Sequence, residues 1–156
     1  MEGTVRAGLA RAGVSLTDVT LHHVLFSDRS PPAGEQDDPP EYAGFALELE
    51  AVRASALHLV VALTLSARSG LPFDLSVTYA AHFEMDASVP AERRDAAWRD
   101  AARRAPELLF PYIRELAANL TARWGEAPLL LPADPEQLGW TPLVPDVPPA
   151  PADAEG

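Results

Sequence analysis

The sequence contains no cysteine, which excludes disulfide bonds and thiolate metal sites and fits a reducing compartment. It also has no apolar run close to the ~20 residues that a membrane-spanning helix needs. The N-terminal residues lack the long apolar core of a secretory signal. We therefore expect a cytoplasmic protein without membrane insertion.

Positive charge is scarce, because 12 Lys and Arg residues stand against 23 Asp and Glu residues. The formal net charge of −11 argues against a nucleic-acid surface, which needs clustered cationic side chains. The same charge favours basic or net-positive partners.

Length and apolar content indicate a folded protein. A chain of 156 residues is most simply one domain, which buries roughly 70% of its unfolded surface. The hydrophobic fraction of 47% is ordinary for a globular chain. We place this domain at residues 1–132, with residues 1–13 as a short N-terminal helix or arm. The proline-rich, acidic residues 133–156 are expected to be a largely disordered tail.

Four segments have the period-two alternation of strands. Short turns join the last three, which predicts an antiparallel meander with the first strand added at an edge. Between the first two strands, residues 28–41 are acidic and proline-rich and are expected to form an exposed loop. The predicted strands are residues 15–27, 43–53, 56–67 and 73–85.

Helical spacing follows the strands. A charged helix is expected at about residues 91–104, and Pro106 should interrupt it. The long helix after it has an apolar stripe, and it should start or kink at Pro111. The stripe is Leu109, Ile113, Leu116, Leu120 and Trp124. Strands followed by helices predict an α+β fold, in which helices pack on one face of a four-stranded antiparallel sheet.

No sequence motif points to an enzyme or to a bound cofactor, and we expect neither. His82 and Glu84 share one face of a strand, and His58 could lie across from them as a third metal ligand. A polar sheet face exposed to solvent or to a subunit is the favoured alternative. For Arg114 and Glu115, contacts with loop or subunit groups are favoured over an acid–base role.

Several apolar residues are candidates for a groove that binds extended peptide segments. On pattern alone they are more readily explained as core, since any half-buried strand shows alternating apolar residues. The candidates are Phe26, Phe45, Leu47, Leu49, Trp98 and Trp124.

One segment of the long helix resembles a known family. Residues 109–115, Leu-Phe-Pro-Tyr-Ile-Arg-Glu, are similar to the Leu-Phe-Pro-Tyr-Ala-Arg-Glu segment of the SecB protein-export chaperones. Residues 128–131 resemble that family's Pro-x-Leu-x-Leu exit from the helix, and the likeness covers roughly residues 15–132. The motif residues are Leu109, Phe110, Pro111, Tyr112, Arg114 and Glu115.

The resemblance implies an ATP-independent holdase for unfolded polypeptides, assembled as a tetramer from two dimers. It also implies that clients lie in long apolar surface grooves, to which the second strand contributes Phe45, Leu47 and Leu49. Such a groove binds extended segments by apolar area and by hydrogen bonds along an edge strand.

The chain departs from the family where SecB docks on the SecA motor. Asp18 matches one docking acid, but His22 and Ser76 or Val77 stand where acids are expected. The chain therefore looks closer to the divergent SecB-like chaperones, some of which guard antitoxins in toxin–antitoxin systems. Three questions stay open: export or antitoxin clients, a dimer or a tetramer, and a chaperone or an interaction module with one dedicated partner.

Overall fold

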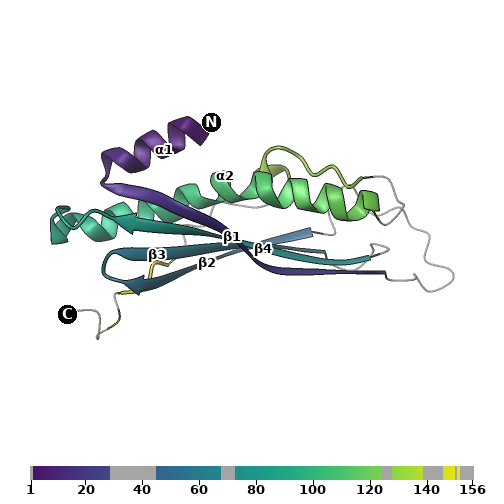
Figure 1. Cartoon of the computed structure of the whole chain (residues 1–156), viewed down its shortest axis with the longest axis horizontal. Coiled ribbons are helices and arrows are strands. Elements are labelled where there is room, and N and C mark those ends of the chain that lie inside the picture. Colours follow the sequence, from purple (N-terminus) through teal and green to yellow (C-terminus); the bar gives the residue numbers. More distant parts are fainter. Residues whose placement is uncertain are drawn as a thin grey trace.

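The computed structural model describes residues 2–28, 45–67, 73–123, 128–138, 146–149 and 151. Figure 1 shows two layers, a twisted sheet and a long helix that crosses it. The elements are α1 (Glu2–Arg11), β1 (Val14–Asp28), β2 (Phe45–Ser55), β3 (His58–Ala67), β4 (Phe73–Met85), α2 (Ala91–Arg123) and the short 3-10 helix η1 (Pro135–Leu138).

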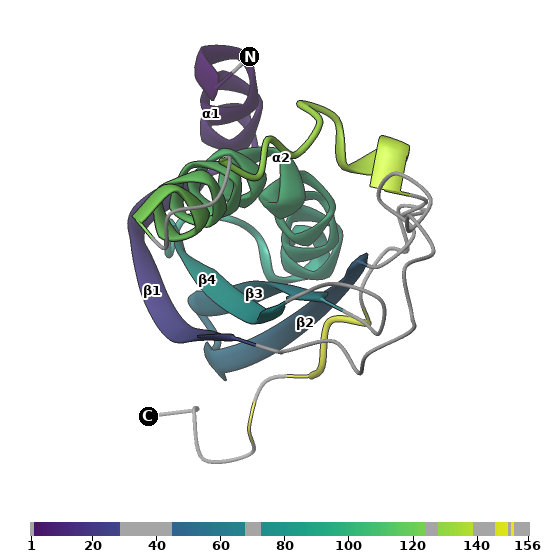
Figure 2. The same ribbon diagram turned by 90° about the vertical axis from the view of Figure 1, so that its right-hand side faces the viewer.

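The sheet has four antiparallel strands in the order β1-β4-β3-β2. β2, β3 and β4 form the expected meander, and β1 is added at an edge beside β4. In Figure 2, α2 lies on one face of this sheet and leaves the other face uncovered by helices. The predicted α+β fold with helices on one face is confirmed.

The core lies between this sheet and α2. Alternate residues of β3, from Leu59 to Leu65, are completely buried, and their neighbours on β4 lie on the same face. From α2, the side chains of Trp98, Leu109 and Ile113 are completely buried against them. The period of two on the strands and of 3.6 on the helix therefore meet in one apolar layer.

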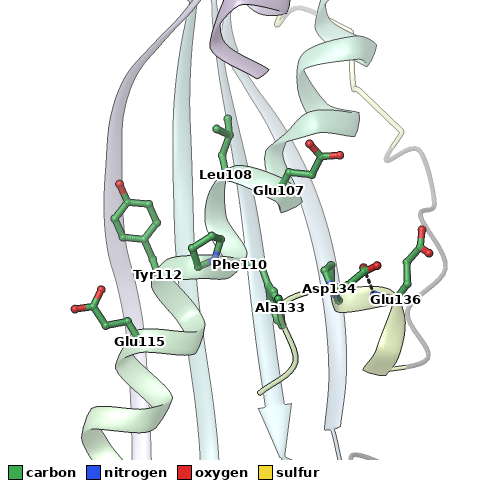
Figure 3. Close-up of a pocket in the computed structure, with 10 residues that line it drawn as sticks. Glu107, Leu108, Phe110, Tyr112, Glu115, Ala133, Asp134 and Glu136 are labelled. Atoms are coloured by element: carbon green, nitrogen blue, oxygen red, sulfur yellow. Dashed lines mark hydrogen bonds between the residues drawn. The ribbon is translucent and has the colours of Figure 1, made fainter. Parts of the chain in front are cut away.

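α2 is a single helix of 33 residues that contains both Pro106 and Pro111. The expectation that Pro106 would interrupt the helix is wrong. Pro106 is buried, as are Ala105 before it and Leu108 after it, so packing on both sides holds the helical path. The expected deformation takes the form of a bend, which Figure 3 shows between Glu107 and Tyr112.

The N-terminal helix α1 packs on the same side as α2, with Val5 and Leu9 buried. Gly13 then turns the chain into β1 with a φ of 76°, a conformation that favours glycine. A Cβ at this position would lie 2.5 Å from the Val89 side chain, so the site also lacks space for one.

After α2, the segment 128–131 is fastened back onto the helix. The Thr121 hydroxyl accepts a hydrogen bond from the Leu129 amide at 2.7 Å, and Arg114 Nε donates to the Leu131 carbonyl at 3.1 Å. The chain then forms η1, and Leu138 packs against the core. Residues 133–138 therefore belong to the folded unit, in contrast to the disordered tail expected from residue 133.

Within the described residues, no helix combines the length and the apolar character needed to cross a membrane.

Candidate functional site

The motif at residues 109–115 divides its side chains between the core and the surface. Leu109, Phe110 and Ile113 are buried and hold α2 on the sheet. Tyr112 faces outward and keeps 40% of its surface exposed, directly after the exposed Pro111. An aromatic side chain with this exposure, beside a bend in a helix, is available to a ligand.

A pocket of about 550 Å³ opens at this bend. One wall is α2 from Glu107 to Glu115, and the other is the segment from Ala133 to Glu136 (Figure 3). Apolar groups line much of it: Leu108, Phe110, Pro111, Tyr112, Ala133 and Pro135. The volume lies within the range of roughly 300–1,000 Å³ that is usual for ligand sites.

The remaining lining residues of the pocket are four acids: Glu107, Glu115, Asp134 and Glu136. In Figure 3, the carboxylates of Glu107 and Glu115 point away from the axis of α2, and the Glu136 carboxylate points away from η1. Asp134 Oδ1 accepts a hydrogen bond from the Glu136 amide at 2.9 Å, which shapes the second wall. The pocket therefore has an apolar lining and a negative charge at the same time.

Tyr112 connects the pocket to an apolar strip, which we define as Leu21, Tyr79 and Tyr112. The Tyr79 and Tyr112 rings lie 5.6 Å apart, and Leu21 pairs with Tyr79 across β1 and β4 with 48% of its surface exposed. Burial raises the pKa of the Tyr79 hydroxyl, and the neighbouring Glu115 and Tyr112 raise it further. This tyrosine therefore stays neutral and acts as a hydrogen-bonding and apolar surface.

The described client-binding candidates do not form one continuous surface. Phe26 lies on β1, with its ring 5.7 Å from that of Phe73, whereas Phe45, Leu47 and Leu49 lie on β2. These strands are opposite edges of the sheet. Phe45 is buried, while Leu47 and Leu49 are half-buried on the face that α2 covers.

The two tryptophan candidates have different outcomes. Trp98 is completely buried, so the structure places it in the core and leaves it no surface for a client. Trp124 lies outside the described residues. Leu47 and Leu49 stay predicted client contacts, because both keep exposed area beside the β2 edge.

The motif arginine has the loop contact expected from sequence. Arg114 Nε donates to the Leu131 carbonyl, which holds the chain that leads into the second wall of the pocket. Glu115 lines the pocket instead. Sequence reasoning missed Glu107 and the residues from Ala133 to Glu136, and the bend at Pro111 was the one signal that an opening lies there.

His58, His82 and Glu84 do lie together on the sheet. The two rings are 5.7 Å apart, and Glu84 is the register partner of His58. His82 Nε2 is hydrogen-bonded to the Thr20 hydroxyl at 3.0 Å. Among the residues that the structure describes, no group of three or more His, Asp or Glu side chains has an arrangement that could hold a metal ion.

Comparison with solved structures gives this geometry a family. The chain is similar to the SecB-like chaperone Rv1957 of Mycobacterium tuberculosis, whose solved structure is a complex with a ChAD peptide from the Rv1956 HigA1 antitoxin. The TM-score is 0.58 at 25% sequence identity, over 84% of this chain and 94% of that chain. The chain is a divergent SecB-like protein.

A second solved structure is less similar to this SecB-like protein. It is a protein of unknown function from Streptococcus agalactiae, with a TM-score of 0.44 and 13% identity over 76% of this chain and 96% of that chain. No family model and no curated protein sequence matches the chain.

Proposed function

We propose that this SecB-like protein is an ATP-independent holdase that binds extended, non-native polypeptide segments. The observation that carries the proposal is the likeness to a SecB-like chaperone in complex with an antitoxin peptide. The pocket at the bend of α2 supports it, because it joins apolar lining to a solvent-exposed tyrosine. The activity requires no chemical step, and we place it in the cytoplasm.

The pocket supplies an anchor point for one apolar side chain of the client. Its four carboxylates would attract Arg or Lys residues that flank this side chain, so the preferred segment is apolar with basic neighbours. From Tyr112 the client would continue over the apolar strip, where Leu21 lies on the edge strand β1. Backbone groups of an edge strand add hydrogen bonds that do not depend on sequence.

A narrower function is favoured by the same solved structure, in which the ligand is a peptide of one antitoxin. Here the protein would guard a single dedicated partner, such as an antitoxin, and would ignore unfolded chains in general. Binding of one partner peptide without suppression of aggregation would select this function. A third use of the same fold would be the binding of export clients that are handed over to SecA through Asp18. The expected assembly is a homodimer or a homotetramer.

The test of the holdase is a pocket-filling substitution with a matched control. Ala133→Trp places an indole into the pocket from an exposed position, and Ala96→Trp adds the same group to an exposed position in the first half of α2. The probe is reduced, carboxamidomethylated pancreatic trypsin inhibitor, which is permanently unfolded and carries a net positive charge. We expect Ala133→Trp to weaken its binding at least about tenfold, a change of about 1.4 kcal/mol. Ala96→Trp should bind it like the unmodified protein.

The proposal is wrong if the unmodified protein, at several-fold excess and without ATP, neither binds this probe nor prevents aggregation of an unfolded substrate. It is also wrong in its choice of site if Ala133→Trp binds as tightly as Ala96→Trp.

A further inference from the structure

The pocket at the bend of α2 has two ends of different chemistry. In Figure 3, Tyr112 and Glu115 lie on one side of the helix, whereas Glu107, Asp134 and Glu136 lie on the other. We call the first pair the tyrosine end and the other three residues the acidic end. The bend itself, with its apolar side chains, lies between the two ends. A ligand that fills the pocket therefore crosses α2 from one end to the other.

The tyrosine end combines aromatic rings with a carboxylate. The rings of Tyr112 and Tyr79 lie 5.6 Å apart, with an angle of 38° between their planes. Burial raises the pKa of the Tyr79 hydroxyl, and the negative charge of Glu115 raises it further, so this carboxylate lies close to the ring pair. An aromatic face attracts an ammonium group within about 6 Å of its centre, and a neighbouring carboxylate adds a charge-assisted hydrogen bond. This end therefore suits a cationic group.

The acidic end has three carboxylates, and no described cationic side chain lines the pocket. Asp134 Oδ1 accepts a hydrogen bond from the Glu136 amide, which leaves the charge of this end unbalanced. Ion pairs between described residues use Asp95 and Asp100 in the first half of α2, and none of them uses an acid of the pocket. The positive charge that balances the acidic end therefore has to come from a ligand or from ions in solution.

The separation of the ends sets the length of a ligand that contacts both. Glu107 and Glu115 are eight residues apart, which is about 12 Å along a straight helix. An extended chain of eight single bonds spans about 9–10 Å. A hydrogen bond of almost 3 Å from an ammonium group to a carboxylate then extends the reach at each end. The surface between the ends is apolar, so methylene groups lie on it favourably and a charged group does not.

We infer that this pocket binds a linear polyamine, a small aliphatic chain whose ammonium groups are separated by methylene groups. One terminal ammonium group contacts Glu115 and the face of Tyr112, and the other contacts Glu107 and Glu136. The methylene groups between them cross the apolar surface at Pro111. A compact cation matches the charge of the pocket but not its apolar surface, and an apolar side chain matches the surface but not the charge.

The test is calorimetric titration of spermidine into the protein in about 20 mM NaCl, where exposed charges are weakly screened. We expect saturable binding that weakens at least about tenfold in the double variant Glu115→Gln, Glu136→Gln, because it loses one carboxylate at each end. The matched control, Glu50→Gln with Glu92→Gln, removes the same charge from exposed positions outside the pocket and should bind like the unmodified protein. Tyr112→Leu keeps an apolar side chain without the aromatic face and should weaken binding about threefold.

Two further ligands with the charge of spermidine distinguish the polyamine from other occupants. Hexaamminecobalt(III) is a compact ion and tests charge alone, and acetylated trilysine amide carries its ammonium groups on a peptide. Spermidine should bind more tightly than either. The inference is overturned if no saturable binding occurs up to about 5 mM spermidine, or if the control variant loses as much affinity as the pocket variant. Equal or tighter binding of hexaamminecobalt(III) or of the trilysine peptide also overturns it. Because no unfolded client is present, these results do not depend on the holdase proposal.

Discussion

The two halves of α2 cover the same sheet but differ in what they bury and in what they leave open. Residues 91–107 bury alanines around Trp98, and residues 108–123 bury Leu109, Phe110 and Ile113. The first half faces solvent with ion pairs from Asp100 to Arg103 at 2.6 Å and to Arg104 at 2.9 Å. The second half instead forms one wall of the pocket and carries the exposed Tyr112.

The difference between the halves lies at their junction. Alanines allow close packing of a helix on a sheet, so the first half has little room for a ligand. At the junction, Pro111 cannot donate the helical hydrogen bond to the Glu107 carbonyl, and the helix bends (Figure 3). The bend, closed on the other side by residues 133–136, creates the opening. The first half therefore supports the fold, and the second half also presents the site.

The largest expected effect separates a core aromatic residue from a surface one. Trp98→Ala should lower the free energy of unfolding by about 3–5 kcal/mol, because the Trp98 side chain is completely buried and its removal leaves a cavity. Tyr112→Ala should cost less than about 1.5 kcal/mol, since 40% of that side chain is exposed. Urea unfolding measures both, and equal losses would remove the distinction between the halves.

The next effect concerns the attachment of the second pocket wall. Arg114→Ala removes the hydrogen bond to the Leu131 carbonyl and should cost about 1.5–3 kcal/mol, as for a hydrogen bond from a charged donor. Thr121→Val leaves the Leu129 amide without its acceptor and should cost about 1–3 kcal/mol. Hydrogen exchange of residues 128–138 should rise in both variants, and unchanged exchange would show that these bonds do not hold the wall.

A smaller effect is expected from removal of the bend. Pro111→Ala restores the amide donor, and a straighter helix should narrow the pocket while the free energy of unfolding stays equal or rises. Binding of the unfolded trypsin-inhibitor probe should weaken about tenfold, or about 1.4 kcal/mol. Retained affinity in a folded Pro111→Ala protein would show that the bend is not needed for binding.

The smallest effect belongs to the ion pairs of the first half. Partial burial raises the pKa of Asp100, but hydrogen bonds and charge from Arg103 and Arg104 outweigh it and bring the pKa below 3.8. A lowered pKa contributes stability above pH 3.8 that is lost as the pH falls through the pKa of the folded state. Asp100→Asn should therefore flatten the acid branch of the stability curve by less than about 1 kcal/mol, because the pair is solvent-screened. An unchanged curve would show that the pair contributes nothing.

The strands could be predicted because alternation on β3 and β4 follows directly from burial of one face, and the short turns between β2, β3 and β4 predicted their meander. The edge to which β1 is added, beside β4, could not be read from the sequence. The continuation of α2 through Pro106 could not be predicted. Local propensity disfavours proline inside a helix, and only the tertiary packing of Ala105 and Leu108 overrides this propensity. The candidate site was predictable in part. Tyr112 and Arg114 are in the motif, whereas the wall from Ala133 to Glu136 reaches α2 through tertiary contacts that no local pattern encodes.

The histidines of the sheet show the same limit: the ring of His82 lies next to those of His22 and His58. The alternation placed His58 and His82 on one face, but the ring contact with His22 depends on the bulge of β1 before His23. Register shifts of this kind arise from pairing across strands and leave no period in the sequence.

The central claim is that a client side chain enters the pocket at the bend of α2. The most direct measurement replaces Tyr112, and in a second protein Ala96, by the photo-crosslinking residue p-benzoylphenylalanine and irradiates each with the unfolded trypsin-inhibitor probe. The account predicts a strong crosslink from position 112 and little from position 96, although both are exposed on α2. Equal crosslinking from both positions, or none from position 112 while the probe is bound, would contradict it.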